Sequence, residues 1–131
     1  MKIWIRIPLL LAVGLICAPL MEFGTLFWFE ALPAGMDLTG NYFLMVVLPV
    51  ALVLHFVVAL ALWKVFEPAP RQGAAIFLAT HVVAQALLLN QFNNPVGDIL
   101  SYCLVLMVTG GGVLFVFNRY FWCPECMRLA Q

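Results

Sequence analysis

The chain has 131 residues, of which 66% are hydrophobic and 9% are charged, and its six cations and six acids give zero net charge. A soluble domain of this length cannot bury so much apolar surface, so the composition is typical of a membrane protein. Six cations without an excess of positive charge also leave no basic surface for a phosphate backbone, which excludes nucleic-acid binding.

Four apolar stretches have about the length needed to cross a bilayer ~30 Å thick, which takes ~20 helical residues. We expect helices over residues 3–29, 42–65, 74–89 and 99–117, joined by short links rich in proline, glycine and asparagine. The sequence therefore predicts an all-α polytopic membrane protein, with residues 1–131 forming a single transmembrane four-helix domain.

The first apolar stretch begins like a secretory signal peptide, with Lys2 and Arg6 at its start. A lipoprotein signal needs a small residue before its cysteine, but Ile16 precedes Cys17, and the apolar run continues to Phe29. This length favours a retained transmembrane helix.

Every cationic side chain falls at one end of the four spans. The six are Lys2 and Arg6 before the first span, Lys64 and Arg71 around the link between the second and third, and Arg119 and Arg128 after the fourth. Short loops rich in lysine and arginine stay in the cytoplasm during insertion. Both termini and the link at residues 67–70 are therefore predicted to be cytoplasmic, while the outer loops carry the acids Glu30, Asp37 and Asp98.

A carboxyl group inside a membrane is costly, which makes Glu22 a candidate functional residue. Gly14, Ala18 and Glu22 follow one another at intervals of four, so they share a helix face on which small residues permit close packing. We expect the Glu22 carboxyl to point into the bundle, in the outer part of the membrane. The alternative is an acid near the interface that reaches outer water.

Two histidines flank the inner link almost symmetrically, since His55 precedes Lys64 by nine residues and His81 follows Arg71 by ten. In adjacent antiparallel helices they would share a depth of ~14 Å from the inner boundary, near the midplane. Gln85 lies one turn beyond His81 on the same face. Such a pair is able to ligate a haem iron, to contact a translocated substrate, to relay protons or to form hydrogen bonds between helices.

The segment after the fourth span contains Cys123 and Cys126, a spacing that suits a redox disulfide or half of a zinc site. The predicted cytoplasmic position argues against a structural disulfide. Three readings stay open: an incidental tail, a metal shared across an oligomer, and thiol redox chemistry.

The two halves of the chain also repeat weakly. Each starts with an inner arginine, Arg6 or Arg71, and ends in a basic and aromatic cluster, at residues 63–67 and 118–122. Two parallel hairpin repeats about an axis normal to the membrane are a known transporter plan. Any four-helix chain with inner termini would give a similar pattern, so both interpretations stand.

The run Phe115-Val116-Phe117-Asn118-Arg119-Tyr120-Phe121-Trp122, the run Trp63-Lys64-Val65-Phe66, and an opening Arg6 followed by Glu22 resemble the GtrA-like family of small four-helix membrane proteins. The resemblance covers nearly the whole chain, including its length and topology. It implies a non-enzymatic flippase that moves a polyprenyl-phosphate-linked sugar across the inner membrane for cell-surface glycan modification. No cofactor is implied, while a membrane glycosyltransferase and other copies of the chain are implied as partners.

On this reading, the inner cations would hold the lipid phosphate and the polar residues of the spans would line the sugar's path. The phosphate or headgroup site would be Arg6, Lys64, Arg71, Asn118 and Arg119, and the substrate path would be Glu22, His55, His81 and Gln85. The alternative for the cations is a topological signal that also contacts anionic lipids.

Two other classes remain. One is a small non-catalytic accessory subunit of a membrane complex, and the other is a haem, metal or thiol redox protein that uses His55 and His81 or Cys123 and Cys126. The sequence has no serine, histidine and acid constellation, glycine-rich phosphate loop or paired catalytic carboxylates, so hydrolase or ATPase activity is not expected.

Overall fold

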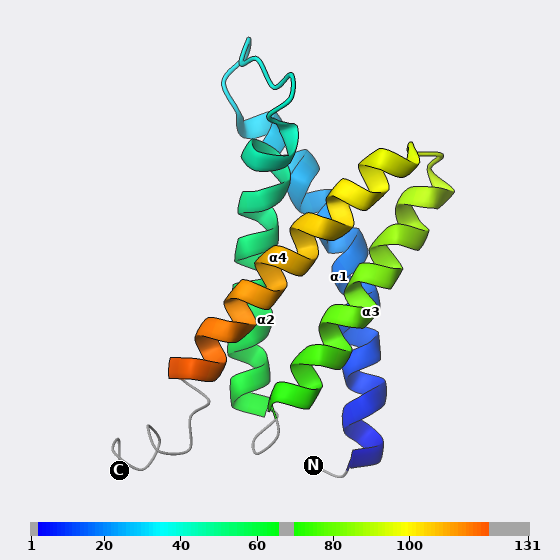
Figure 1. The fold of residues 1–131 in the computed structure, drawn as a ribbon, viewed down its shortest axis with the longest axis vertical. Coiled ribbons are helices and arrows are strands. Elements are labelled where there is room, and N and C mark those ends of the chain that lie inside the picture. Colours follow the sequence, from blue (N-terminus) through cyan, green and yellow to red (C-terminus); the bar gives the residue numbers. More distant parts are fainter. Residues whose placement is uncertain (1–2, 66–69, 121–131) are drawn as a thin grey trace.

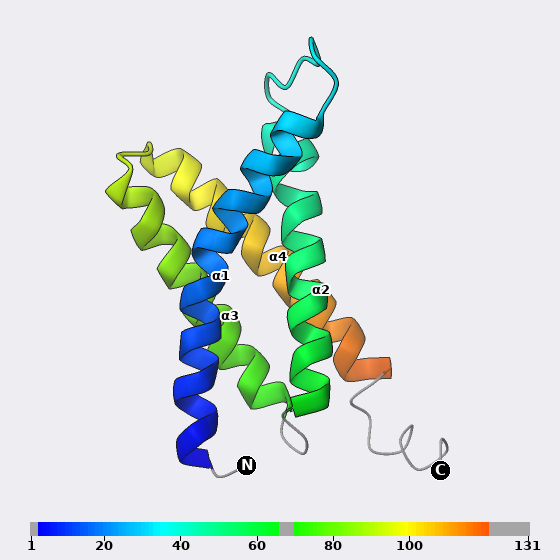
Figure 2. The ribbon, with the colours of Figure 1, turned by 180° about the vertical axis from the view of Figure 1, so that it is seen from behind.

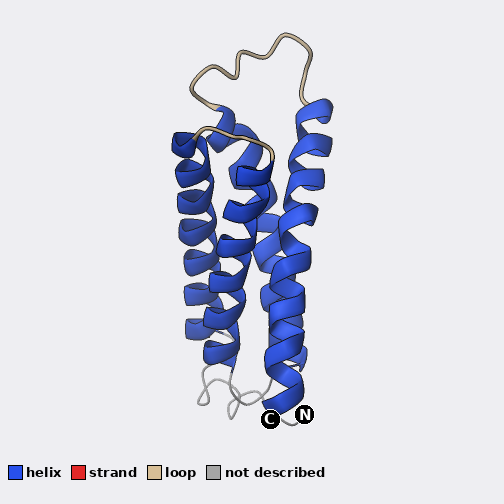
Figure 3. Ribbon diagram, turned by 90° about the vertical axis from the view of Figure 1, so that its right-hand side faces the viewer, coloured by secondary structure: helices blue, strands red, loops and turns tan. Residues whose placement is uncertain are grey.

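The computed structural model describes residues 3–65 and 70–120, and in these ranges it is a bundle of four long helices (Figures 1 and 3). They are α1 (Ile3–Ala31), α2 (Leu48–Val65), α3 (Pro70–Gln91) and α4 (Val96–Tyr120), and a π-helical turn, η1 (Phe43–Val47), leads into α2. Each of the four has a segment long and apolar enough to cross a membrane. The predicted all-α, multi-pass fold is confirmed.

The third and fourth helices extend beyond their predicted bounds. Helix α3 begins at Pro70, four residues before the expected start, because proline has a fixed backbone angle that suits a first helical turn. Helix α4 begins after Pro95, whose carbonyl accepts hydrogen bonds from the amides of Asp98 and Ile99. Asp98 lies in the first turn of α4 and Arg119 in its last, so both charges oppose the helix dipole favourably.

Asparagines end α3 and turn the chain sharply into α4. Asn93 adopts a left-handed backbone conformation with φ 55°, which asparagine tolerates better than most residues. The backbone amide and the side-chain amide of Asn94 both donate to the Leu89 carbonyl, at 3.2 and 3.0 Å. These bonds satisfy a carbonyl that the end of the helix leaves free.

The helices do not pack in chain order. Helix α1 lies mainly against α3, α2 lies mainly against α4, and α3 also lies along α4. Helices α2 and α3, which were expected to be adjacent and antiparallel, do meet, but over only a short stretch. A twofold axis between the two hairpins would also make α1 pack on α2 as α3 packs on α4, but α3 lies much more closely along α4 than α1 does along α2.

Two groups of buried apolar side chains fill the bundle. The inner core cluster consists of Leu10, Cys17, Val58, Ala59, Leu62, Ala74, Phe77 and Phe117. The outer core cluster consists of Met21, Val47, Ala51, Leu89, Tyr102 and Leu106. On the predicted outer side the ends of α1 and α2 diverge from those of α3 and α4 (Figures 1 and 2).

Glycine permits the close crossing of α1 and α3. A Cβ atom at Gly14 would lie 2.8 Å from both Cβ and Cγ2 of Thr80 and 3.3 Å from the backbone nitrogen of His81. Ala18, one turn further along α1, is 2% exposed. The predicted small-residue face of α1 therefore does pack closely, and it packs against α3.

Pro49 explains an aromatic contact between α1 and the start of α2. Proline has no N–H group, so the carbonyl of Met45, four residues earlier, lacks its usual helical donor. The indole Nε1–H of Trp28 donates to that carbonyl at 2.9 Å. This bond connects the irregular turn η1 to the outer end of α1.

The loop between α1 and η1 has an ordered turn of its own. The backbone amide of Thr39 donates to the Asp37 carboxylate at 2.9 Å, and Gly35 and Gly40 have positive φ angles of 89° and 75°. Hydrogen bonds from Thr39 lower the pKa of Asp37. This acid is exposed, in the loop that is predicted to face the outside.

Candidate functional site

The Glu22 carboxyl points into the bundle and meets the third helix. The Gln85 side-chain amide on α3 donates a short hydrogen bond to Glu22 Oε1 on α1. Gln85 is fully buried, whereas Glu22 is partly exposed at the outer end of the bundle. The bond joins a midplane residue to a residue at the outer opening, which sequence spacing did not predict.

His55 on α2 and His81 on α3 face each other, with ring centroids 5.3 Å apart, as their equal distances from the inner link predicted. They are 1% and 0% exposed. Phe77 lies against both rings, with centroid distances of 6.1 Å to His55 and 5.7 Å to His81. The pair lies where the inner and outer core clusters adjoin, and Phe77 closes its inner side.

Thr109 on α4 fixes the state of the His55 ring. Its Oγ1 lies 2.8 Å from the Val105 carbonyl and 3.1 Å from His55 Nδ1. A threonine hydroxyl has one hydrogen, and the bond to Val105 uses it. The His55 ring also bonds to the Ala51 backbone, and because Nε2 has no partner, the bond comes from Nδ1–H. His55 Nδ1 therefore carries the hydrogen, with Thr109 Oγ1 as a second acceptor, and Nε2 carries a lone pair.

Four buried polar atoms of this cluster have no hydrogen-bond partner among the described residues. They are His55 Nε2, both ring nitrogens of His81, and Gln85 Oε1. Nearly all buried polar groups in proteins are hydrogen-bonded, so four orphaned atoms in one place need an explanation.

Two residues of the cluster were not recognised from the sequence in this role. Tyr102 of α4 is 5% exposed, and its hydroxyl donates to Thr25 Oγ1 at 3.4 Å and also reaches the Glu22 carboxyl. Thr109 lies on the same face of α4, seven residues later. That spacing, two helical turns, was the available signal.

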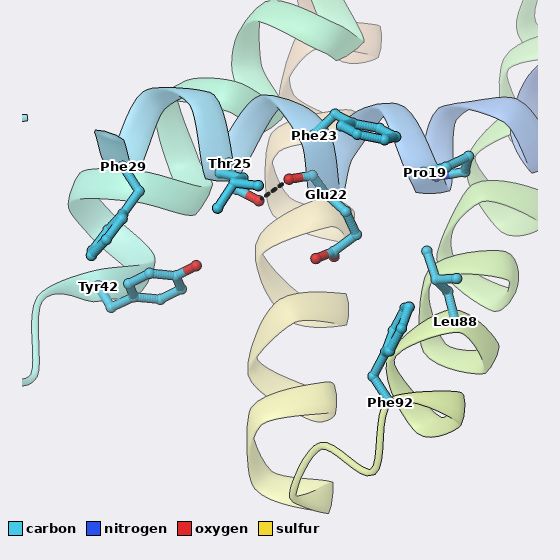
Figure 4. A pocket seen from close by; sticks show the side chains of 9 residues that line it. Pro19, Glu22, Phe23, Thr25, Phe29, Tyr42, Leu88 and Phe92 are labelled. Carbon is cyan, nitrogen blue, oxygen red and sulfur yellow. Dashed lines mark hydrogen bonds between the residues drawn. The ribbon is translucent and has the colours of Figure 1, made fainter. Parts of the chain in front are cut away.

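An apolar hollow of about 500 Å³ opens beside Glu22 at the outer end. Figure 4 shows the Glu22 carboxyl and the Tyr42 hydroxyl directed into it, with Leu88 and Phe92 of α3 and its following turn on another side. Phe23, which also lines it, is 72% exposed, so the hollow opens toward lipid.

A second, polar hollow of about 460 Å³ adjoins the first. The two share Glu22, Tyr42 and Phe92. Asn94, Asp98 and Tyr102 add polar groups, and the residues that complete the lining are Phe43 and Leu89. Asp98 is exposed, so this hollow opens toward the outer loops. Glu22 thus lies where a lipid-facing and a loop-facing hollow meet.

The inner cations lie at the opposite end of the bundle. Arg6 and Asn118 are half-buried and Arg119 is exposed. Lys64 and Arg71 lie at the inner ends of α2 and α3, and their side chains are outside the described part of the chain. The backbone places all five near the inner boundary, far from Glu22.

The alternatives based on redox or metal chemistry have little geometric support. The histidine rings are direct neighbours at 5.3 Å in a closed core, which is not the arrangement of two ligands on opposite faces of a haem. No three His, Cys, Asp or Glu side chains converge on a metal site within residues 3–65 and 70–120. Cys123 and Cys126 lie outside the described residues.

Comparisons with protein-family models, with curated proteins and with solved structures found no match for this chain.

Proposed function

We propose that this protein is a GtrA-like flippase, which moves a polyprenyl-phosphate-linked sugar across the inner membrane for cell-surface glycan modification. The observation that carries the proposal is the pair of hollows that share Glu22. A lipid-linked sugar has an apolar chain and a polar head, and it needs a site with one compartment for each.

The apolar hollow suits the lipid. Phe23, Leu26 and Leu88 line it, and the first two are largely exposed toward the surrounding membrane. A prenyl chain in this position would keep contact with the bilayer, so binding would not require its extraction from the membrane.

The polar hollow suits a neutral sugar better than a phosphate. Carboxylates at Glu22 and Asp98 accept hydrogen bonds from hydroxyl groups, whereas they repel a phosphate anion. Asn94 offers an amide, and Phe43 and Phe92 offer apolar rings. The phosphate joins the prenyl chain to the sugar, so it is expected at the inner boundary, where Arg6 and Arg119 lie, before the chain and the sugar reach the hollows.

The test uses the purified chain in liposomes that contain a polyprenyl phosphate carrying one radiolabelled hexose. Periodate, which oxidises vicinal diols and does not cross the bilayer, is then added outside. With the protein present, the whole labelled pool should become oxidised, whereas protein-free liposomes should lose only the outer-leaflet fraction. Equal protection with and without protein would reject the proposal.

Two variants give the test its specificity. Glu22→Gln should slow the loss of protection about tenfold or more, because it removes a charged acceptor at the junction of the hollows. Asp37→Asn removes a carboxylate from the outer loop, outside both hollows, and should behave like the unaltered protein. If both variants slow exposure equally, the effect belongs to outer charge and not to the hollows.

A further inference from the structure

One added proton would give each of the four unpaired buried atoms at the midplane a hydrogen-bond partner. His55 Nε2 and Gln85 Oε1 are acceptors. A neutral His81 has one N–H donor and one nitrogen acceptor, so it is able to donate to only one of these two acceptors. The other acceptor then has no donor and faces the unprotonated nitrogen of His81. A protonated His81 has two donors, one for each acceptor.

We propose that His81 is a proton-binding site in the middle of the membrane, in which the protonated imidazole donates to His55 Nε2 and to Gln85 Oε1. This inference goes beyond the flippase proposal and does not rest on it. The ligand is a proton, which forms an N–H bond with the free ring nitrogen and needs no cavity.

The three side chains of this proposal are neighbours in the bundle. The two imidazole centroids are already 5.3 Å apart. Gln85 follows His81 by four residues on α3, and side chains at this spacing are neighbours on one helix face. The His55 tautomer required is the one that Thr109 already selects.

Glu22 supplies the counter-charge. The Gln85 amide donates to the Glu22 carboxyl, so its oxygen end is available for the cationic ring. An ionised Glu22 and a protonated His81 have no net charge together, which reduces the cost of placing a cation in the membrane. The Gln85 side chain therefore bridges an acid and a base on two different helices.

The proton is expected to come from the outer side. Glu22 lines both outer hollows, whereas Phe77, Leu62 and Phe117 of the inner core cluster close the path toward the cytoplasm.

Few other charges face the pair. The titratable groups around it in the described residues are Glu22 and Cys17 from α1, His55 from α2, and Tyr102 and Cys103 from α4. The described cations Arg6 and Arg119 lie at the inner helix ends. Glu22 is thus the only carboxyl among these groups.

The chain has only two histidines, so histidine-selective ¹⁵N labelling gives a spectrum of this pair alone. We would titrate the full chain in lipid nanodiscs from about pH 4 to about pH 9, a range centred near ordinary imidazole titration. The expected result is uptake of one proton by His81, with both of its nitrogens protonated, while His55 stays in the Nδ1–H form.

Glu22→Gln should weaken proton binding by His81 about tenfold, so the midpoint moves to lower pH, because the carboxylate no longer stabilises the cation. Asp98→Asn, which removes the other carboxylate of the polar hollow, should change the affinity less than about twofold, because solvent screens that exposed group.

The titration of the unaltered chain decides the main claim even if a variant fails to fold. A His81 ring that stays neutral throughout, protonation of His55 in its place, or independent protonation of both rings would each overturn it. An unchanged midpoint in folded Glu22→Gln would remove Glu22 as the counter-charge. Sugar translocation is not part of the readout, so failure here leaves the flippase proposal untouched.

Discussion

Gln85 on α3 donates its side-chain amide hydrogen to the Glu22 carboxyl on α1, and this bond connects two helices that are also in close apolar contact. The bond joins the polar midplane to the outer hollows. It is therefore both a structural link and part of the candidate site.

We expect the two side chains to be coupled in stability. Gln85→Leu leaves a partly buried carboxyl without its amide donor and should lower the unfolding free energy by about 1–2 kcal/mol. Glu22→Leu should lower the unfolding free energy less in the Gln85→Leu background than in the unaltered chain. The difference, which is the coupling free energy, should be about 0.6–1.7 kcal/mol, as for other membrane hydrogen bonds. Reversible unfolding in mixed micelles measures all four variants. Strict additivity would mean that the bond contributes nothing.

Gly14→Ala should destabilise the bundle by about 1–3 kcal/mol, because the new Cβ would lie 2.8 Å from the branched Cβ of Thr80 and force α1 and α3 apart. Gly111→Ala is the matched control. It lies in α4 with no atom within 4 Å of the new Cβ, so the alanine should be neutral or stabilising by up to ~1 kcal/mol. Similar losses for both would contradict a close crossing at Gly14.

The Trp28 bond should depend on the proline that frees its acceptor. Trp28→Phe should cost about 0.5–1.5 kcal/mol by removing the donor to the Met45 carbonyl. In a Pro49→Ala background the alanine amide is able to donate to the same carbonyl, so the tryptophan substitution should cost clearly less. The unfolding free energies of these four chains give the comparison, and an equal cost in both backgrounds would disprove the dependence.

The topology predicted from the cations is testable by thiol labelling. Cys17 and Cys103 are buried, so a chain with Cys123→Ser and Cys126→Ser is a suitable background. An impermeant maleimide added to intact cells should label Asp37→Cys in the outer loop and should not label Ala69→Cys in the inner link until the membrane is opened. The reverse pattern would invert the orientation.

If the inner cations hold a lipid phosphate, Arg119→Ala should abolish sugar exposure in the liposome assay with little change in folding, since its side chain is exposed. Arg119→Lys should restore only part, because an ammonium lacks the bidentate geometry of guanidinium. Arg128→Ala, beyond the last helix, is the control and should have no effect. Equal losses at both positions would leave the cations as a topological signal only.

The sequence by itself determined the all-α class of the chain and its four apolar helices, and it predicts their orientation. The thickness of the bilayer sets how long an apolar helix must be to cross it, and the positive-inside rule predicts which loops stay in the cytoplasm. Both rules apply to each segment separately. Equal spacing from one boundary also placed His55 and His81 at one depth, because helical rise is constant. None of these inferences needed to know which helices are neighbours.

The tertiary structure decided which side chains meet. Glu22 bonds Gln85 only because α1 packs on α3, and Thr109 reaches His55 only because α4 packs on α2. In lipid, every helix is apolar on most faces, so the hydrophobic pattern does not specify neighbours. Neighbours are instead selected by close fits such as Gly14 against Thr80, which depend on three-dimensional shape and cannot be read from spacing along one helix.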